Sequence, residues 1–475
     1  MIAGALLLLI LPLLMAGLVY LLLRWASLSA LLAVGTALLL GVVVVTLPFD
    51  EPVHFWGGRQ IAMGEAVTFL GRELVLEQAD RIAMASLFFT AAGLFFVAWR
   101  FAPRSQIFPM GLGLLSLLCG ALLIRPLIYA ALLIEIAAAL SIFALQVEGG
   151  TPTRGGLRYL TFVVLALPGL LVTHWLLDRY ALTPDETVLL STSTILLTVS
   201  FALLLGVVPF HTWVTAVADD SLPLAGVFVL TVGNGAIWFL LLEFLEAYPW
   251  LSGHPRFESI VSTAGLAMVI VGGLLAPAQR RLGRLIGYGA VVDSGAALLA
   301  LAMNSQVGVT LVILSLMVRP FGLILMAAGL SGLRARSGNG DTSDALRGLG
   351  WKAVWSTAAL VFGGLSVAGL PVSAGFAWRW PLYRALALSS PGSEAFLLLA
   401  GIGVMVGVWR GLSALLVRPH SQKDRSVISQ NSSEDWLTAA VVIVAILGCV
   451  GVGLFPQTIA PAAARLAESY TFFAH

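Results

Sequence analysis

The chain has 475 residues, of which 59% are hydrophobic and only 11% are charged, and its formal net charge is +2. So little polar surface cannot cover a soluble globule of this size, whereas apolar runs long enough to cross a bilayer recur throughout the sequence. The composition therefore excludes a soluble protein and indicates a polytopic membrane protein. No phosphate-binding, dinucleotide or nucleic-acid-binding motif interrupts this pattern.

We expect an all-α fold with about fourteen membrane-spanning helices. The first apolar run lacks a basic flank and is too long for a cleaved signal, so it is predicted to be a retained helix. In chain order, the apolar runs place the helices at residues 3–23, 28–48, 80–100, 106–124, 126–147, 157–178, 187–209, 220–246, 257–277, 284–303, 306–331, 351–388, 394–417 and 436–456.

Two of these helices are predicted to be broken, near residues 206–224 and 369–376. The second lies in a segment much longer than the roughly 20 residues that one crossing needs. Breaks at membrane depth are tolerated where the freed backbone groups are enclosed by protein or line a hydrated cavity. The helix-breaking residues are Pro209, Pro223, Gly369, Pro371 and Gly375.

The positive charges indicate an orientation. Sixteen lysines and arginines fall in loops on one side of the predicted helices, against eight on the other, which places both termini on the outer side of an inner or energy-coupling membrane. We divide the chain into residues 1–79 (two helices and an outer loop), 80–417 (the core) and 418–475 (a polar linker, the last helix and a tail). Cys119 and Cys449 lie in apolar runs without metal-ligand spacing, so we expect neither a metal nor a cofactor.

Ionisable side chains at membrane depth are costly, so each is a candidate functional group. Glu135 lies in the middle of an apolar helix on a face without a basic residue, which favours a function over a structural ion pair. Asp293 is interpreted either as a functional carboxylate or as a bridge to Arg319 or Arg379. The two arginines are alternatively explained by snorkelling at helix ends. His211 and Asn234 flank the first break.

Four motifs resemble one membrane family when they are taken in order. They are VVPFHTW at residues 207–213 with Pro223 ten residues later, RRLGRLIGYGAVVDSG at 280–295, LMVRPFGLILMAAGL, and AGLPVSAGFAWRW. The chain resembles the proton-conducting antiporter-like subunits of respiratory complex I, Mrp-type cation/proton antiporters and membrane-bound hydrogenases. The resemblance implies a fourteen-helix fold with inverted repeats, in which half-channels meet along a polar axis midway through the membrane.

The resemblance also assigns residues to that axis. Glu135 falls where the family has its fifth-helix glutamate, and Arg319 and Arg379 fall where it has lysines. The seventh-helix lysine is replaced by Leu204, the eighth-helix lysine by Asn234 and a histidine by Asp293. The only lysines of the chain, Lys352 and Lys423, are not at membrane depth. Arginine stays charged at all accessible pH values and cannot replace lysine as a proton relay.

Three hypotheses follow. The first is a membrane-arm subunit of a complex I-like or hydrogenase-type oxidoreductase that moves protons or cations through Glu135, His211, Asn234 and Asp293, with Arg319 and Arg379 as fixed charges. The second is a degenerate, non-pumping structural or assembly subunit of such a complex, because Leu204 and Asn234 replace lysines. The third is an Mrp-like ion antiporter subunit. All three imply membrane-subunit partners, lipid and no nucleic acid, and the first two leave redox catalysis to other subunits.

Overall fold

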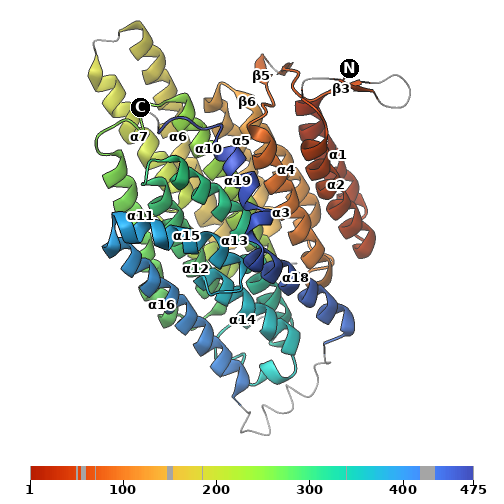
Figure 1. Cartoon of the computed structure of the whole chain (residues 1–475). Coiled ribbons are helices and arrows are strands. Elements are labelled where there is room, and N and C mark those ends of the chain that lie inside the picture. Colours follow the sequence, from red (N-terminus) through yellow and green to blue (C-terminus); the bar gives the residue numbers. More distant parts are fainter. Residues whose placement is uncertain are drawn as a thin grey trace.

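The computed structural model describes residues 2–49, 52–54, 60–69, 71–146, 153–183, 186–338, 340–417 and 434–473, and Lys423 and the linker 418–433 lie outside them. Its α-helices form one bundle (Figure 1). They are α1 (Gly4–Leu21), α2 (Ala26–Thr46), α3 (Asp80–Phe101), α4 (Ile107–Leu123), α5 (Ala130–Leu145), α6 (Arg154–Leu182), α7 (Thr187–Leu205), α8 (Thr212–Asp220), α9 (Pro223–Phe228), α10 (Asn234–Ala247), α11 (Phe257–Leu275), α12 (Leu282–Leu301), α13 (Gln306–Arg336), α14 (Val354–Ala368), α15 (Ala374–Ser389), α16 (Pro391–Leu416), α18 (Trp436–Leu454) and α19 (Ala460–Ala467).

Short 3-10 and π-helical segments connect several of these helices. The 3-10 turns are η1 (Leu127–Tyr129), η3 (Ala276–Ala278), η4 (Leu349–Trp351) and η5 (Pro456–Thr458), and one π-helical segment, η2 (Val229–Gly233), connects α9 to α10. Among the described residues, twelve helical segments are long and apolar enough to cross a membrane, and α4 and α14 are shorter apolar helices. These fourteen segments confirm the predicted number.

Two small sheets lie at one end of the bundle, outside the helices (Figure 1). One has the order β1-β3-β2, with β1 parallel and β2 antiparallel to β3, and the other has the antiparallel order β4-β5-β6. The all-α expectation therefore describes the helical bundle but missed these strands, which are too short to show an alternating pattern. The strands are β1 (Ile2–Ala3), β2 (Val53–His54), β3 (Gln60–Ala62), β4 (Val67–Phe69), β5 (Arg72–Leu74) and β6 (Ile124–Arg125).

The helices divide into an interior group and an outer group. The run from α9 to α10, together with α12 and α13, is buried on nearly every side, whereas most residues of α1, α6 and α18 are partly or fully exposed. A helix that is apolar all round is stable either in lipid or inside a bundle, and both cases occur here. α13 packs on α12, α14 and α15, so the polar side chains of these four helices can meet in the interior.

Candidate functional site

The first predicted break is confirmed, and it consists of two interruptions with α8 between them. α7 ends at Leu205, and Gly206 adopts the left-handed conformation at a φ of 67°. The amide of Val207 donates to the carbonyl of Ala202 at 2.8 Å, and the amide of Gly206 donates to Leu203 at 3.3 Å, a Schellman ending. The Trp213 indole also donates to the Leu203 carbonyl, at 3.1 Å. The freed backbone groups of α7 are thus partly satisfied within the protein.

The second break, between α14 and α15, is built in the same way. Gly369 is left-handed at a φ of 81°, and the amide of Leu370 donates to the Leu365 carbonyl at 3.1 Å. The amide of Gly375, near the start of α15, donates to the Ser366 hydroxyl at 3.1 Å. The likeness of the two breaks is what an internal repeat would produce. Arg379 lies one turn after Gly375, so this break sets its position.

A hydrogen-bonded network runs through the interior between the two breaks. On α13, the Arg319 guanidinium donates to the Asn234 side-chain oxygen at 2.6 Å and to the Ser294 hydroxyl at 3.2 Å. Asn234 is the first residue after the π-helical segment η2, and such segments are frequent at functional sites. Asn234 and Ser294 are both buried. One arginine therefore links α10, α12 and α13.

Asp293, next to Ser294 on α12, extends the network to the second broken helix. Its Oδ1 lies 3.3 Å from a terminal nitrogen of Arg379 on α15. Asp293 is 4% exposed and Arg379 is fully buried. Both structural partners considered for Asp293 are thus nearby, but the direct ion pair is with Arg379, while Arg319 contacts the adjacent serine.

The network holds unused hydrogen-bonding groups beside a small cavity. Among the described residues, Asp293 Oδ2, Arg319 Nε and both Nε and Nη1 of Arg379 have no hydrogen-bond partner. Asp293 and Arg319 line a cavity of about 10 Å³, together with Ser366, Gly375 and Trp378. This volume is near the lower limit for one water molecule. The lining is mostly apolar, but the free oxygen of Asp293 and the Arg319 guanidinium give a water of this size polar partners.

The network carries an excess of positive charge. Two buried guanidinium groups share one carboxylate, and neither arginine can lose its proton. Removing one member of a buried ion pair leaves an uncompensated charge, which is far more costly than losing an exposed pair. Asp293 is the single carboxylate among the five side chains of the network, and its charge partly compensates both arginines.

The structure does not join the remaining candidates to this network. Glu135 is half-buried on α5, and no hydrogen bond or ion pair of its side chain occurs among the described residues. His211 lies at the start of α8, with its Nδ1 buried and without a partner there, and its ring centroid is 6.3 Å from that of Tyr288. Tyr288 precedes Asp293 on α12. Their roles in ion transfer stay predictions.

Leu204 occupies an apolar site at the end of α7. It is 1% exposed and belongs to the hydrophobic core, with Phe201 and Leu205 as buried neighbours in the sequence. Lys352, by contrast, follows the 3-10 turn η4 before α14.

We expect Leu204→Lys to destabilise the protein strongly, because a lysine at membrane depth costs about 3 kcal/mol even on the mildest insertion scale. Heating detergent-solubilised protein and following the monodisperse peak in size-exclusion chromatography measures this effect. Leu204→Met, which conserves volume, is the matched control and should cost less than about 1.5 kcal/mol. Equal melting of the two variants would show that the site is already hydrated.

Sequence reasoning missed an ionic cluster where α8, α12 and α13 end or begin. Asp219 lies 3.0 Å from Arg281 and 2.8 Å from Arg284, and Asp341 lies 3.0 Å from Arg281 and 2.8 Å from Arg334. The cluster ties the second half of the first broken helix to its neighbours. The sequence shows Asp219 next to Asp220, and Arg281 just before α12. Nothing in it indicates that the loop after α13 brings Asp341 back to Arg281.

Comparisons with known proteins agree with this architecture. A family described as NADH:quinone oxidoreductase/Mrp antiporter, transmembrane, matches residues 155–406. Over 271 residues the chain is 27% identical to NADH-quinone oxidoreductase subunit N of Ectopseudomonas mendocina, covering 54% of this chain and 52% of that protein. Over 267 residues it is 30% identical to subunit N 1 of Solidesulfovibrio magneticus, covering 55% and 56%. The chain thus spans about half the length of the curated relatives it matches.

Solved structures are similar along nearly the whole chain. A chain of the Mrp complex from Dietzia sp. aligns with a TM-score of 0.80 at 16% identity, covering 98% of this chain and 97% of that one. A chain of the archaeal membrane-bound sulfane sulfur reductase gives 0.79 at 16%, covering 99% and 98%. A chain of complex I from Thermus thermophilus gives 0.76 at 20%, covering 99% and 100%. At these identities the likeness shows a shared fold.

Proposed function

Because the chain belongs to the NADH:quinone oxidoreductase/Mrp antiporter membrane family, we propose that it is a membrane-arm subunit of a complex I-like or hydrogenase-type redox complex and conducts protons there. Partner subunits carry the redox chemistry, and both termini lie on the outer side of the membrane. The observation that carries the proposal is the buried Asp293, with one oxygen on Arg379 and the other free, in a water-sized cavity.

The geometry supports a simple division of roles. Asp293 takes up and releases a proton at Oδ2, and Arg319 and Arg379 are permanent charges that favour the ionised form of the carboxylate. A displacement of α15 at its break would separate Arg379 from Asp293 and favour protonation of the carboxylate. Broken helices suit such movement because a few residues around the break can absorb the change.

One observation favours a second function, that of a non-pumping structural subunit. Leu204 makes the end of α7 apolar and buried where a relay would need a titratable group, and Glu135 has no side-chain partner among the described residues. In this alternative the arginine–aspartate network fixes the helices, and the chain contributes to assembly. Deleting the subunit would then disrupt the complex, while single substitutions of the candidate relays would leave pumping unchanged.

Glu135→Gln distinguishes the two functions. We expect it to abolish redox-driven proton translocation by the assembled complex in sealed vesicles while the complex still assembles, because glutamine keeps the shape but cannot carry a proton. Glu258→Gln, in the exposed first turn of α11, is the matched control and should pump normally. Pumping at the wild-type ratio in Glu135→Gln would remove Glu135 from the route, and the same result for Asp293 variants would favour the structural subunit.

A further inference from the structure

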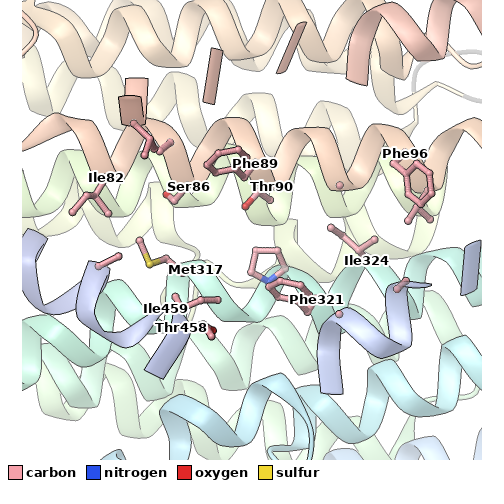
Figure 2. A pocket seen from close by; sticks show the side chains of 18 of the residues that line it. Ile82, Ser86, Phe89, Thr90, Phe96, Met317, Phe321, Ile324, Thr458 and Ile459 are labelled. Atoms are coloured by element: carbon pink, nitrogen blue, oxygen red, sulfur yellow. The ribbon is translucent and has the colours of Figure 1, made fainter. Parts of the chain in front are cut away.

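A large groove, separate from the buried network, opens between α2, α3, α13, α18 and the C-terminal segment. Its volume is about 700 Å³. In Figure 2, Ile82, Ser86, Phe89 and Thr90 of α3 lie across it from Met317 and Phe321 of α13. Thr458 and Ile459 also line it, on the same side as Met317 in this view (Figure 2). The space is thus bordered by helices from both ends of the chain.

The walls of this groove are apolar along most of its length. On α3 the lining residues follow helical spacing from Arg81 to Val97, a distance of about 24 Å at 1.5 Å per residue. The hydrocarbon core of a bilayer is about 30 Å thick, so the length of the groove is comparable with most of that thickness. A hydrocarbon chain could therefore lie along the groove over its whole length.

Glycines leave room on two of the facing helices. A Cβ placed on Gly93 of α3 would meet no atom within 4 Å, and one on Gly448 of α18 would meet only Phe321, at 3.7 Å. Both glycines line the groove. The packing of the chain itself therefore does not require glycine at these places, and the open space beside them is available to an occupant.

Two arginines are among the residues that line the groove. Arg81, in the first turn of α3, and Arg465, in α19, both line it, and neither forms an ion pair with a carboxylate of the described residues. Arg81 donates to the carbonyls of Val44, Val45 and Leu47 at the end of α2, which fixes its position. Arg465 is exposed. The mostly apolar lining of the groove thus includes two positive charges, those of Arg81 and Arg465, that no carboxylate of the described residues pairs with.

We propose that this groove binds an anionic phospholipid, whose acyl chain fills the channel between α3, α13 and α18 and whose phosphate contacts Arg81 and Arg465. An amphiphile with one anionic head and a long apolar tail matches both the charge and the lining. A transmembrane helix from a partner subunit would fill the apolar part, but it would leave the two guanidinium groups without an anion unless it also carried acidic residues there. The charge complementarity therefore selects the lipid.

Native mass spectrometry of the purified full-length chain tests the headgroup. The probes are phosphatidylglycerol and phosphatidylcholine with identical acyl chains. We expect the wild type to retain phosphatidylglycerol preferentially, and Arg81→Gln/Arg465→Gln to retain it roughly thirtyfold less, the factor expected when two basic contacts at a membrane surface are lost. Because Arg81 also holds the end of α2, Arg465→Gln alone is measured too and should give part of the loss. Equal retention of the two lipids by the wild type would overturn the proposal.

Filling the groove tests the acyl-chain site without touching the arginines. Gly93→Leu should reduce retention of both lipids, because the new side chain occupies the channel. Gly17→Leu on α1 is the matched control, since a Cβ there also meets no atom within 4 Å, and it should retain lipid as the wild type does. Unchanged retention in Gly93→Leu would contradict binding in this groove.

A photo-crosslinker decides between the lipid and a partner helix. p-Benzoylphenylalanine replaces Phe89, an exposed aromatic side chain in the groove, and the intact complex is irradiated in its native membrane. We expect an adduct with the mass of a phospholipid. An adduct with the mass of a second protein would overturn the proposal and identify the groove as a subunit interface.

Discussion

Asp293→Asn is expected to be among the most destabilising single substitutions in this protein. The change leaves the guanidinium groups of Arg319 and Arg379 buried without a carboxylate, and breaking a buried ion pair from one side costs about 3–5 kcal/mol. The asparagine is nearly isosteric, so the loss arises from charge rather than from packing. Thermal unfolding of the solubilised protein, followed by size-exclusion chromatography, measures it.

Two further variants separate this charge effect from other causes. Asp344→Asn removes the carboxylate of a surface pair, 3.0 Å from Arg347, with both side chains mostly exposed, and should cost less than about 1 kcal/mol. Asp293→Asn/Arg379→Gln keeps the net charge of the buried network at its wild-type value and should regain much of the lost stability. If Asp293→Asn melted at the same temperature as Asp344→Asn, the buried pair would not hold the interior together.

Gly375→Ala is expected to disturb the second broken helix. A Cβ on this residue would lie 1.8 Å from the carbonyl oxygen of Ser366, a backbone atom that cannot rotate away. The start of α15 must therefore move away from the end of α14, and overpacking of this kind costs about 1–3 kcal/mol or more. Because Arg379 follows one turn later, the shift also lengthens its contact with Asp293. Both melting temperature and proton translocation should fall.

Gly17→Ala is the control for this substitution. Gly17 lies inside α1, and an added Cβ there meets no atom within 4 Å, so alanine should be neutral or stabilising by about 0.5–1 kcal/mol through its better helix propensity. Wild-type stability and pumping in Gly375→Ala would mean that the two halves of the broken helix are not held at the observed separation.

Much of the bundle could be predicted from local sequence features. The lengths of the apolar runs predict the fourteen segments, and proline and glycine predict both breaks. Both signals are local, because each depends only on residues within the segment itself. The π-helical segment before Asn234 and the short strands around residues 53–74 could not be predicted, because neither produces a periodic pattern. The π-helical segment packs on α3, α4 and α13, and the strands pair with segments as distant in sequence as Ile2 and Arg125.

The polar residues of the interior could be found, but their pairing could not. The cost of charge in a membrane singled out Asp293, Arg319 and Arg379. Which arginine pairs with Asp293 depends on the rotation of α12, α13 and α15 against each other, and one residue of rotation exchanges Asp293 for Ser294. Glu135 was singled out by the same reasoning, yet it lies half-buried on α5 without a side-chain partner among the described residues.

Redox-driven proton translocation by the assembled complex in sealed vesicles tests the central proposal most directly, when Asp293→Asn/Arg379→Gln is compared with Arg379→Gln alone. The two variants differ only in the carboxylate, and the double variant keeps the wild-type net charge of the network. If Asp293 carries the proton, the double variant transfers electrons but moves fewer protons per electron than the single variant. An equal ratio in both variants, at the wild-type value, would contradict the account.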